Sequence, residues 1–154
     1  MIQNKYKKLN IGCGRNYMEG WVNWDISHET KADAYLDIGK DPYPVKDAEF
    51  DEIYCSGVLE QLLTTKELIH ALNECHRVLK DTGSITIIVP SAKFSNAFKD
   101  PMDVRQFTEG TFQYFDGESH EFKHFGSVYG FKPWHLTTIF TNEQGIITAV
   151  MQKR

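Results

Sequence analysis

A glycine turn between two short apolar segments is the feature that most constrains the fold of this chain. The first segment, residues 8–11, runs directly into Gly12-Cys13-Gly14, and the second, residues 21–24, ends at Asp25. This order predicts a strand, a tight turn and a second strand that ends in a carboxylate. Glycines allow a ligand to approach the backbone closely, and a carboxylate in this place can accept hydrogen bonds from both hydroxyls of a ribose. The sequence therefore favours a nucleoside-containing ligand at the carboxyl edge of a parallel sheet.

The glycine spacing also narrows the class of nucleoside. The dinucleotide-binding fingerprint G-x-G-x-x-G has a third glycine three positions after the second, where a helix N-terminus receives a pyrophosphate. Here Tyr17 stands at that position, and neither Arg15 nor Asn16 supplies the glycine. A ligand that contains a ribose but no pyrophosphate fits this pattern better.

Composition and charge exclude several classes of protein. The chain has 154 residues, of which 41% are hydrophobic and 25% charged, as in one globular domain with one core. The net charge of −4 argues against nucleic acid as a partner, because binding to phosphates requires a basic surface. No apolar run is long enough for a membrane helix. The three cysteines have unrelated spacings, which favours free thiols in a reducing cytoplasm.

Periodicity predicts the remaining elements. Strands are expected at residues 32–36, 50–55 and 84–89, and a terminal hairpin at 134–141 and 145–152. A capping box at Thr64 and Glu67 opens the clearest helix, and Gly83 is expected to end it. A shorter helix is expected at 108–115. These elements predict an α/β sandwich whose mostly parallel sheet carries an antiparallel strand at one edge.

Two segments add further expectations. Residues 94–131 contain eight of the ten phenylalanines, so we expect them to form a cap that walls a substrate pocket. The segment between Gly14 and Trp21 is too short for the usual crossover helix, so helices on one face of the sheet are reduced. Either that face is buried in a homodimer or against a partner, or Tyr17, Met18, Trp21 and the C-terminal residues cover it.

An ordered series of motifs resembles the type 11 subgroup of class I S-adenosylmethionine (SAM)-dependent methyltransferases. The series runs from the glycine turn through Asp37-Ile38, Tyr43-Pro44-x-x-Asp47-x-x-Phe50-Asp51-x-Ile53 and Val58-Leu59-Glu60-Gln61-Leu62 to Glu74-x-x-Arg77-Val78-Leu79-Lys80 with Gly83. The resemblance covers residues 8–90 and implies a Rossmann-like fold over a single SAM-dependent methyltransferase domain, residues 1–154. It implies SAM as the cofactor.

The resemblance also implies roles for individual residues. The glycine turn would face the methionine part of SAM, Asp25 the ribose, and the segments after the second, third and fourth strands the adenine and the transferred methyl group. The implied cofactor-binding residues are Ile11, Gly12, Cys13, Gly14, Asp25, Ile26, Asp37, Ile38, Ser56 and Gly57. No metal ligands are implied.

The acceptor site is less defined. Residues 100–108 resemble a D-P-x-H-x-R-x-F segment of a compact subgroup linked to glycan or cell-surface biosynthesis, so the acceptor is expected to be a small molecule or a saccharide. His120, His124 and Asp103 are the candidate catalytic bases, and Arg105 is the candidate for holding an acceptor carboxylate or phosphate. Gln61 stands where the family often has histidine, which puts catalytic competence in question.

Two other functions stay open. A non-catalytic SAM-binding protein that serves as a partner or regulatory subunit is compatible with the small size and with Gln61. His120-Glu121-x-x-His124 matches the zinc metalloprotease motif, which would make the chain a metallohydrolase, although the surrounding glycines disfavour the long helix that this motif needs. Methylation of nucleic-acid amino groups is disfavoured, because Cys55-Ser56-Gly57 follows the fourth predicted strand in place of an Asp/Asn-Pro-Pro-aromatic motif.

Overall fold

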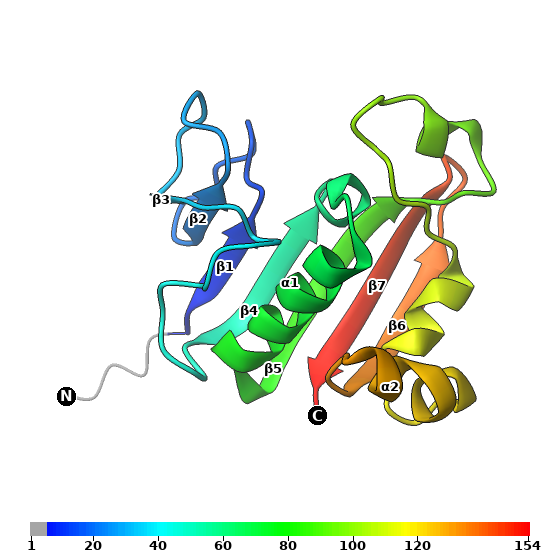
Figure 1. The fold of residues 1–154 in the computed structure, drawn as a ribbon. Helices are drawn as coiled ribbons and strands as arrows, with labels where there is room; N and C mark the ends of the chain where they lie inside the picture. Colours follow the sequence, from blue (N-terminus) through cyan, green and yellow to red (C-terminus); the bar gives the residue numbers. More distant parts are fainter. Residues whose placement is uncertain (1–5) are drawn as a thin grey trace.

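The computed structural model describes residues 6–154 and contains one seven-stranded sheet of order β3-β2-β1-β4-β5-β7-β6 (Figure 1). The five strands β1 to β5 are mutually parallel, and β7 runs antiparallel to both β5 and β6. This is the Rossmann-like arrangement that the sequence predicts. The strands are β1 Lys8–Ile11, β2 Val22–Asp25, β3 Ala34–Tyr35, β4 Phe50–Ser56, β5 Leu79–Pro90, β6 Trp134–Thr141 and β7 Ile146–Lys153.

Helix α1, Thr65–Val78, connects β4 to β5 and lies across both strands (Figure 1). Its predicted start is confirmed, because the Thr64 side chain accepts a hydrogen bond from Glu67 N at 3.2 Å. Its buried positions Leu68, Ala71, Leu72, Cys75 and Val78 recur at helical spacing on one face. The remaining helical segments are short: η1 Leu59–Gln61, η2 Ser95–Phe98, η3 Glu109–Tyr114, η4 Phe122–Gly126 and α2 Ser127–Tyr129.

The predicted end of this helix at Gly83 is wrong. Leu79 already has extended backbone angles, and its pairing with Phe50 begins strand β5. The next pair along the two strands is Glu52 with Ser84, so residues 80–83 bulge out of the ladder. Gly83 belongs to this bulge, where an added Cβ would stand 2.8 Å from Leu79 Cδ2 and 3.2 Å from Asp51 O. The glycine is required by close packing and not by a helix cap.

The two faces of the sheet are covered differently. Ile85, Ile87 and Val89 of β5 are at most 1% exposed and face α1, whereas the alternate residues Thr86 and Ile88 are only half-buried. The helical segments within residues 6–154 lie on the α1 side of the sheet or at its edges (Figure 1). The reduced coverage of one face, which the short connections predict, is therefore present.

A pair of buried asparagines replaces the missing crossover helix between β1 and β2. Asn10 and Asn23 lie side by side on the less covered face, 2% and 0% exposed, and Asn10 Nδ2 donates to Asn23 Oδ1 at 2.9 Å. Asn23 Nδ2 donates to Met18 O and Trp21 O, and its Oδ1 accepts from Met18 N. Asn10 Nδ2 also donates to Asn16 O. The two amides thereby hold the connecting loop, residues 12–21, against the sheet.

The aromatic segment 94–131 does not form the single cap that the sequence suggests. Its first part, which includes η2, lies at the carboxyl edge of the sheet, where Phe107 pairs with Ser91 (Figure 1). Segment η3 then runs beside β6, and η4 and α2 lie at the opposite edge, where Asp116 pairs with Trp134. The predicted helix at 108–115 is present as the 3₁₀ segment η3. Only the first part of the segment can contribute to a pocket at the carboxyl edge.

Two further features concern the chain as a whole. All three cysteines have free thiols, and Cys13, Cys55 and Cys75 are all buried. Among residues 6–154, none of the helices combines the length and the apolar character that crossing a bilayer would require.

Replacement of Asn23 by alanine tests the role of the asparagine pair. Asn23→Ala leaves the amide of Asn10 and several buried backbone groups of the loop without partners. We expect the free energy of unfolding to fall by about 2–4 kcal/mol. Urea denaturation measures this change. Asn16→Ala is the matched control, because Asn16 is exposed and only its backbone carbonyl takes part in the network. Equal stability of the Asn23→Ala variant and this control would contradict the assignment.

Candidate functional site

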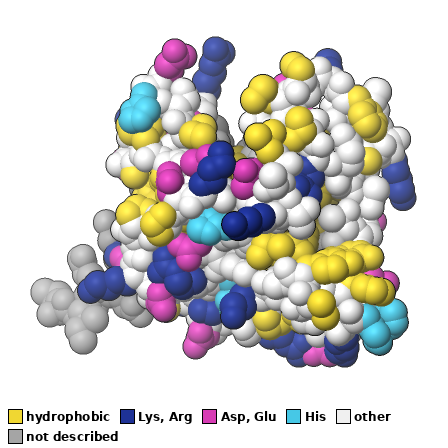
Figure 2. Space-filling model, viewed as in Figure 1, with side chains coloured by type: hydrophobic (Ala, Val, Ile, Leu, Met, Phe, Trp, Pro, Cys, Tyr) yellow, Lys and Arg dark blue, Asp and Glu magenta, His cyan; other side chains and the backbone are white. Residues whose placement is uncertain are grey.

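A pocket of about 450 Å³ opens at the carboxyl ends of β1, β2 and β4. Figure 2 shows the hollow in the upper edge of the molecule, between the loops of β1–β3 and the loop that follows β5. This is the edge at which parallel α/β sheets bind their ligands. The lining residues are Gly12, Gly14, Asp25, Ile26, Leu36, Asp37, Ile38, Lys40, Gly57, Val58, Gln61, Leu62, Leu63, Glu67 and Met102.

The two glycines of the turn are required for different reasons. Gly12 has a φ of +64°, and a Cβ at this position would stand 2.1 Å from Val58 Cγ2. Any side chain at Gly12 would therefore collide with the loop after β4. Gly14 also has a positive φ, +50°, but a Cβ there would meet nothing within 4 Å. Gly14 therefore leaves an open space on the wall of the pocket that a ligand can occupy.

Asp25 links the glycine turn to the end of β2. Its Oδ2 accepts a hydrogen bond from Gly14 N at 2.7 Å, and its Oδ1 accepts from Ser27 N at 2.8 Å. The side chain is 8% exposed and lines the pocket. A carboxylate has about four acceptor sites, so both oxygens retain capacity for hydroxyl donors. The two backbone bonds fix the orientation of this carboxylate before any ligand binds.

A charged group lines the pocket beyond β3. Lys40 Nζ lies 3.2 Å from Asp37 Oδ2 and 3.9 Å from Glu67 Oε1. The hydrogen bond to Asp37 is the main cause that raises the pKa of Lys40, and the charge of Glu67 adds to it. The sequence does not predict Lys40 or Glu67 as site residues. The fold of the loop after β3 brings Lys40 to the pocket, and the start of α1 brings Glu67 there.

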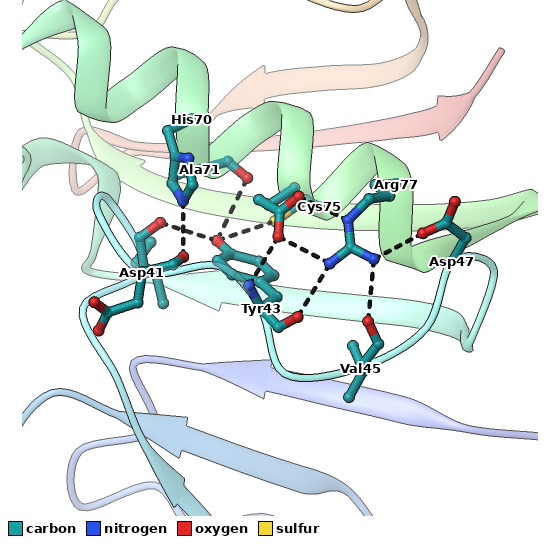
Figure 3. Close-up of polar contacts among 10 residues, drawn as sticks. Asp41, Tyr43, Val45, Asp47, His70, Ala71, Cys75 and Arg77 are labelled. Atoms are coloured by element: carbon teal, nitrogen blue, oxygen red, sulfur yellow. Dashed lines mark hydrogen bonds and ion pairs between the residues drawn. The ribbon is translucent and has the colours of Figure 1, made fainter.

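A polar network fastens the loop after β3 to α1 (Figure 3). Arg77 Nε donates to Glu74 Oε1 at 2.7 Å, and Arg77 Nη1 donates to Asp47 Oδ1 at 2.8 Å. The backbone N–H of Tyr43 donates to Glu74 Oε2, and His70 Nε2 bonds with Asp41 O at 2.8 Å. The hydrogen bond from Arg77 is the main cause that lowers the pKa of Glu74. The network holds residues 41–47, and with them the wall formed by residues 36–40.

The structure brings seven of the ten predicted cofactor residues to this pocket and leaves three outside it. The seven are Gly12, Gly14, Asp25, Ile26, Asp37, Ile38 and Gly57. Ile11 is fully buried in the sheet, and Cys13 donates its backbone N–H to Trp24 O at 3.0 Å. Ser56 pairs with Ile88, whose side chain is on the less covered face of the sheet.

The predicted acceptor-site residues separate into two groups. Asp103 accepts a hydrogen bond from the pocket residue Gln61 at 3.5 Å, and Arg105 Nε donates to the carbonyl of Leu62, also a pocket residue, at 3.3 Å. Both therefore lie beside the pocket. His120 and His124 are exposed, immediately before and within η4, at the opposite edge of the sheet (Figure 1). The fold thus separates the two histidines from the pocket in which they were expected to act.

His120 and His124 also belong to the sequence that matches the metalloprotease motif. The rings of His120 and His124 are stacked with centroids 4.0 Å apart, and His124 Nδ1 bonds with His120 O at 2.9 Å. The motif lies on a short helical segment, residues 120–129, whose central turn, Phe122–Gly126, is a π-helix. Within the described part of the chain, no group of three or more His, Cys, Asp or Glu side chains is arranged to hold a metal ion.

Glu60 is a buried residue of the Val58-Leu59-Glu60-Gln61-Leu62 motif for which the sequence predicts no role in the site. Its side chain is 3% exposed, and Oε2 has no hydrogen-bond partner among residues 6–154. Burial, assisted by Asp103 and Asp100, raises the pKa of Glu60 to about 7. The sequence signals are its place in this motif and its position between Leu59 and Leu62 in an apolar segment after a strand.

The pocket and the sheet order together define a Rossmann-like methyltransferase fold. The chain matches the family described as "Methyltransferase domain", type 11, over residues 9–87, just over half of its length. The chain belongs to this family of SAM-dependent methyltransferases, whose cofactor is SAM. No curated protein matches the chain.

Solved structures with the same fold are distant in sequence. A SAM-dependent methyltransferase from Archaeoglobus fulgidus is 16% identical, with a TM-score of 0.69 over 97% of this chain and 87% of that one. A TehB-like SAM-dependent methyltransferase from Corynebacterium glutamicum is 18% identical, with a TM-score of 0.62 over 97% and 80%. One from Aquifex aeolicus is 12% identical, with a TM-score of 0.63 over 97% and 82%.

The residues present suit SAM. The pocket volume of about 450 Å³ falls within the range of roughly 300–1,000 Å³ that is usual for cofactor sites. The open space at Gly14 and the oriented carboxylate of Asp25 offer contacts for an amino-acid end and a ribose. Ile26, 65% exposed on the wall, offers an apolar surface for a base.

Replacement of Arg77 by glutamine tests the network in Figure 3. Arg77→Gln should lower the free energy of unfolding by about 1–3 kcal/mol, because Glu74 and Asp47 lose a charged donor. The pKa of Glu74 is lowered in the folded state, so its contribution is present at neutral pH and lost as the pH falls through that folded pKa. The difference between wild type and variant should therefore shrink in acid.

Urea denaturation at several pH values measures this difference. Arg15→Gln is the control, since Arg15 is exposed and forms no ion pair within residues 6–154. A deficit that stays constant down to the lowest pH would contradict the role of Glu74.

Proposed function

We propose that this protein transfers the methyl group of SAM to a small-molecule or saccharide acceptor. The observation that carries the proposal is the pocket at the carboxyl edge, in which the glycine turn and Asp25 are held together by the bond from Gly14 N to Asp25 Oδ2. This is the arrangement expected of a site for a ribose-containing cofactor without pyrophosphate.

Each wall of the pocket takes a distinct role in the proposal. Gly12 and Gly14 accommodate the methionine end of SAM, and Asp25 accepts the ribose hydroxyls. Ile26 packs against the adenine, and Asp37 accepts from its amino group. Gly57 borders the place of methyl transfer. Support comes from the position of these six residues, which all line one continuous pocket.

The chemistry makes few demands on the side chains. SAM supplies a methyl group that its sulfonium already activates. The residues of the chain have to align the acceptor with that methyl group and exclude water. A base is needed only if the acceptor is an alcohol or a protonated amine. Asp103, which bonds with the pocket residue Gln61, is the better placed of the three candidate bases.

The alternative is a protein that binds SAM without transferring its methyl group and acts as a partner or regulatory subunit. Gln61, which lines the pocket where the family often has histidine, is compatible with it. Incubation with radiolabelled SAM and a panel of small carboxylates, phosphates, amines and saccharides distinguishes the two. Transfer to any acceptor supports the enzyme, and tight SAM binding with no transfer supports the alternative.

Replacement of Asp25 tests the cofactor site. Asp25→Ala should weaken SAM binding by about 1–3 kcal/mol, because the ribose hydroxyls and Gly14 N lose their acceptor. Calorimetric titration with SAM and with its product S-adenosylhomocysteine (SAH) should show a similar loss for both, since both carry the ribose. Asp81→Ala is the control, as the Asp81 side chain is 97% exposed. Unchanged affinity in the Asp25 variant would refute the ribose assignment.

Arg105 tests the acceptor side. Arg105→Ala should leave the free energy of SAM binding within about 0.5 kcal/mol of wild type and reduce methyl transfer to anionic acceptors of the panel. The ion pairs found within residues 6–154 do not include Arg105, so its guanidinium is available to an acceptor carboxylate or phosphate. Lys99→Ala removes an exposed cation from the same loop as a control. If SAM affinity falls instead, Arg105 belongs to the cofactor site.

A further inference from the structure

A buried carboxyl group lies directly behind the wall of the pocket where the methyl group would be transferred. Glu60 belongs to η1, and its neighbours Gly57, Val58, Gln61 and Leu62 all line the pocket. A Cβ built on Gly57 would lie 3.8 Å from Glu60 Oε1, with no other atom within 4 Å. The carboxyl group therefore lies close to Gly57, which lines the pocket.

The carboxyl group is not neutralised by the protein. Oε2 has no hydrogen-bond partner, and no cation lies within ion-pair distance of Glu60 in the described part of the chain. The carbonyl of Glu60 accepts from both Val104 N at 3.0 Å and Arg105 N at 2.9 Å, which packs the loop at 100–105 over η1. The side chain is thereby kept from water. The backbone N–H groups of Glu60 and Val58 favour its ionised form, but no cation among residues 6–154 pairs with it, so ionisation stays costly unless a positive charge approaches.

The titratable groups that face Glu60 are acidic. Asp103 and Asp100 approach it from the loop, and Cys55 faces it from β4. The Cys55 thiol is fully buried, and its pKa is raised well above the usual value, so it stays neutral. This part of the site therefore carries a negative potential that increases when Glu60 ionises.

The reaction centre of the proposed transfer lies against this potential. Gly12, beside the proposed methionine site, contacts Val58, the residue that follows Gly57. A sulfonium held between these two loops is adjacent to Gly57. SAM carries this permanent positive charge, and SAH has a neutral sulfur in its place. The remaining charges of the two molecules, an amino group and a carboxylate, are the same.

We propose that Glu60 is the residue by which the pocket distinguishes SAM from SAH, because its ionised carboxylate, behind Gly57, attracts the sulfonium charge that only SAM carries. This inference rests on the proposed function, since it requires SAM in this pocket. Glu60 does not need to touch the cofactor, because the attraction acts across the glycine backbone in a region of low dielectric constant. Release of the product is favoured in the same step, since methyl transfer removes the charge that Glu60 attracts.

The preference of the pocket for SAM over SAH should increase with pH. The pKa of Glu60 is raised to about 7, so below this pH the carboxyl group is neutral and the preference for SAM is weak. Above this pH the carboxylate is ionised and SAM binding is strengthened relative to SAH. The ratio of the two dissociation constants, SAH over SAM, should therefore rise with pH. We expect a rise of about tenfold, from one unit charge acting over a few ångströms of partly shielded protein.

Calorimetric titration of the full chain with SAM and separately with SAH, between about pH 5.5 and 8.5, measures this ratio. The two ligands carry the same kinds of titrating groups, and comparison with Glu60→Gln separates their titration from that of Glu60. In Glu60→Gln the ratio should stay at its low-pH value throughout. Glu67→Gln is the matched control: it also removes a carboxylate from the pocket, but on the side of Lys40, and should keep the step.

A second variant keeps the test valid if Glu60→Gln does not fold. Asp103→Asn removes one of the negative charges that raise the pKa of Glu60, so the step in the ratio should move to lower pH. A ratio independent of pH in the wild type, or a step that persists in Glu60→Gln, would overturn the role of Glu60 while leaving the SAM site intact. Absence of binding by both ligands would overturn the proposed function and this inference together.

Discussion

The hydrogen-bonded pair of Asn10 and Asn23 is the interaction on which the site depends. A parallel strand pair normally uses a helix to return the chain, and here about ten residues have to make the same connection. The two amides satisfy the backbone of the connecting loop on one face of the sheet. On the carboxyl edge, the same loop begins with Gly12 and Gly14. The positions of the glycines relative to Asp25 are thus fixed by contacts on the other side of β1 and β2.

Much of the fold could be predicted from the sequence because its signals are local. Alternation of apolar residues located β1, β4 and the terminal hairpin, and the Thr64 cap located the start of α1. The end of α1 could not be predicted in this way. A glycine at the position of Gly83 is typical of a helix cap. The pairing of Leu79 with Phe50, which is distant in sequence, instead makes Gly83 part of a strand bulge. Tertiary pairing overrides a local signal at this position.

The site was predictable to a similar degree, for a related reason. The glycine turn and Asp25 belong to one short strand–loop–strand unit, so their contact follows from the pairing of β1 with β2. The burial of Glu60 depends on the loop at residues 100–105 folding back over η1, as the bonds from Val104 N and Arg105 N show. His120 looked chemically suitable, but its place is set by the path of segment 94–131 past β6 to the far edge. Neither the burial of Glu60 nor the position of His120 produces a periodic pattern in the sequence.

The position of β7 has a consequence for how the chain folds during synthesis. This strand follows in sequence every other strand of the sheet, yet it lies between β5 and β6 and pairs with both. Until residues 146–153 have left the ribosome, β5 presents an apolar, unpaired edge that no earlier strand covers. The parallel part of the sheet, which carries the pocket, can form first, since β1 to β5 are already complete. The nascent chain therefore exposes an aggregation-prone edge for the time needed to translate the segment between β5 and β7.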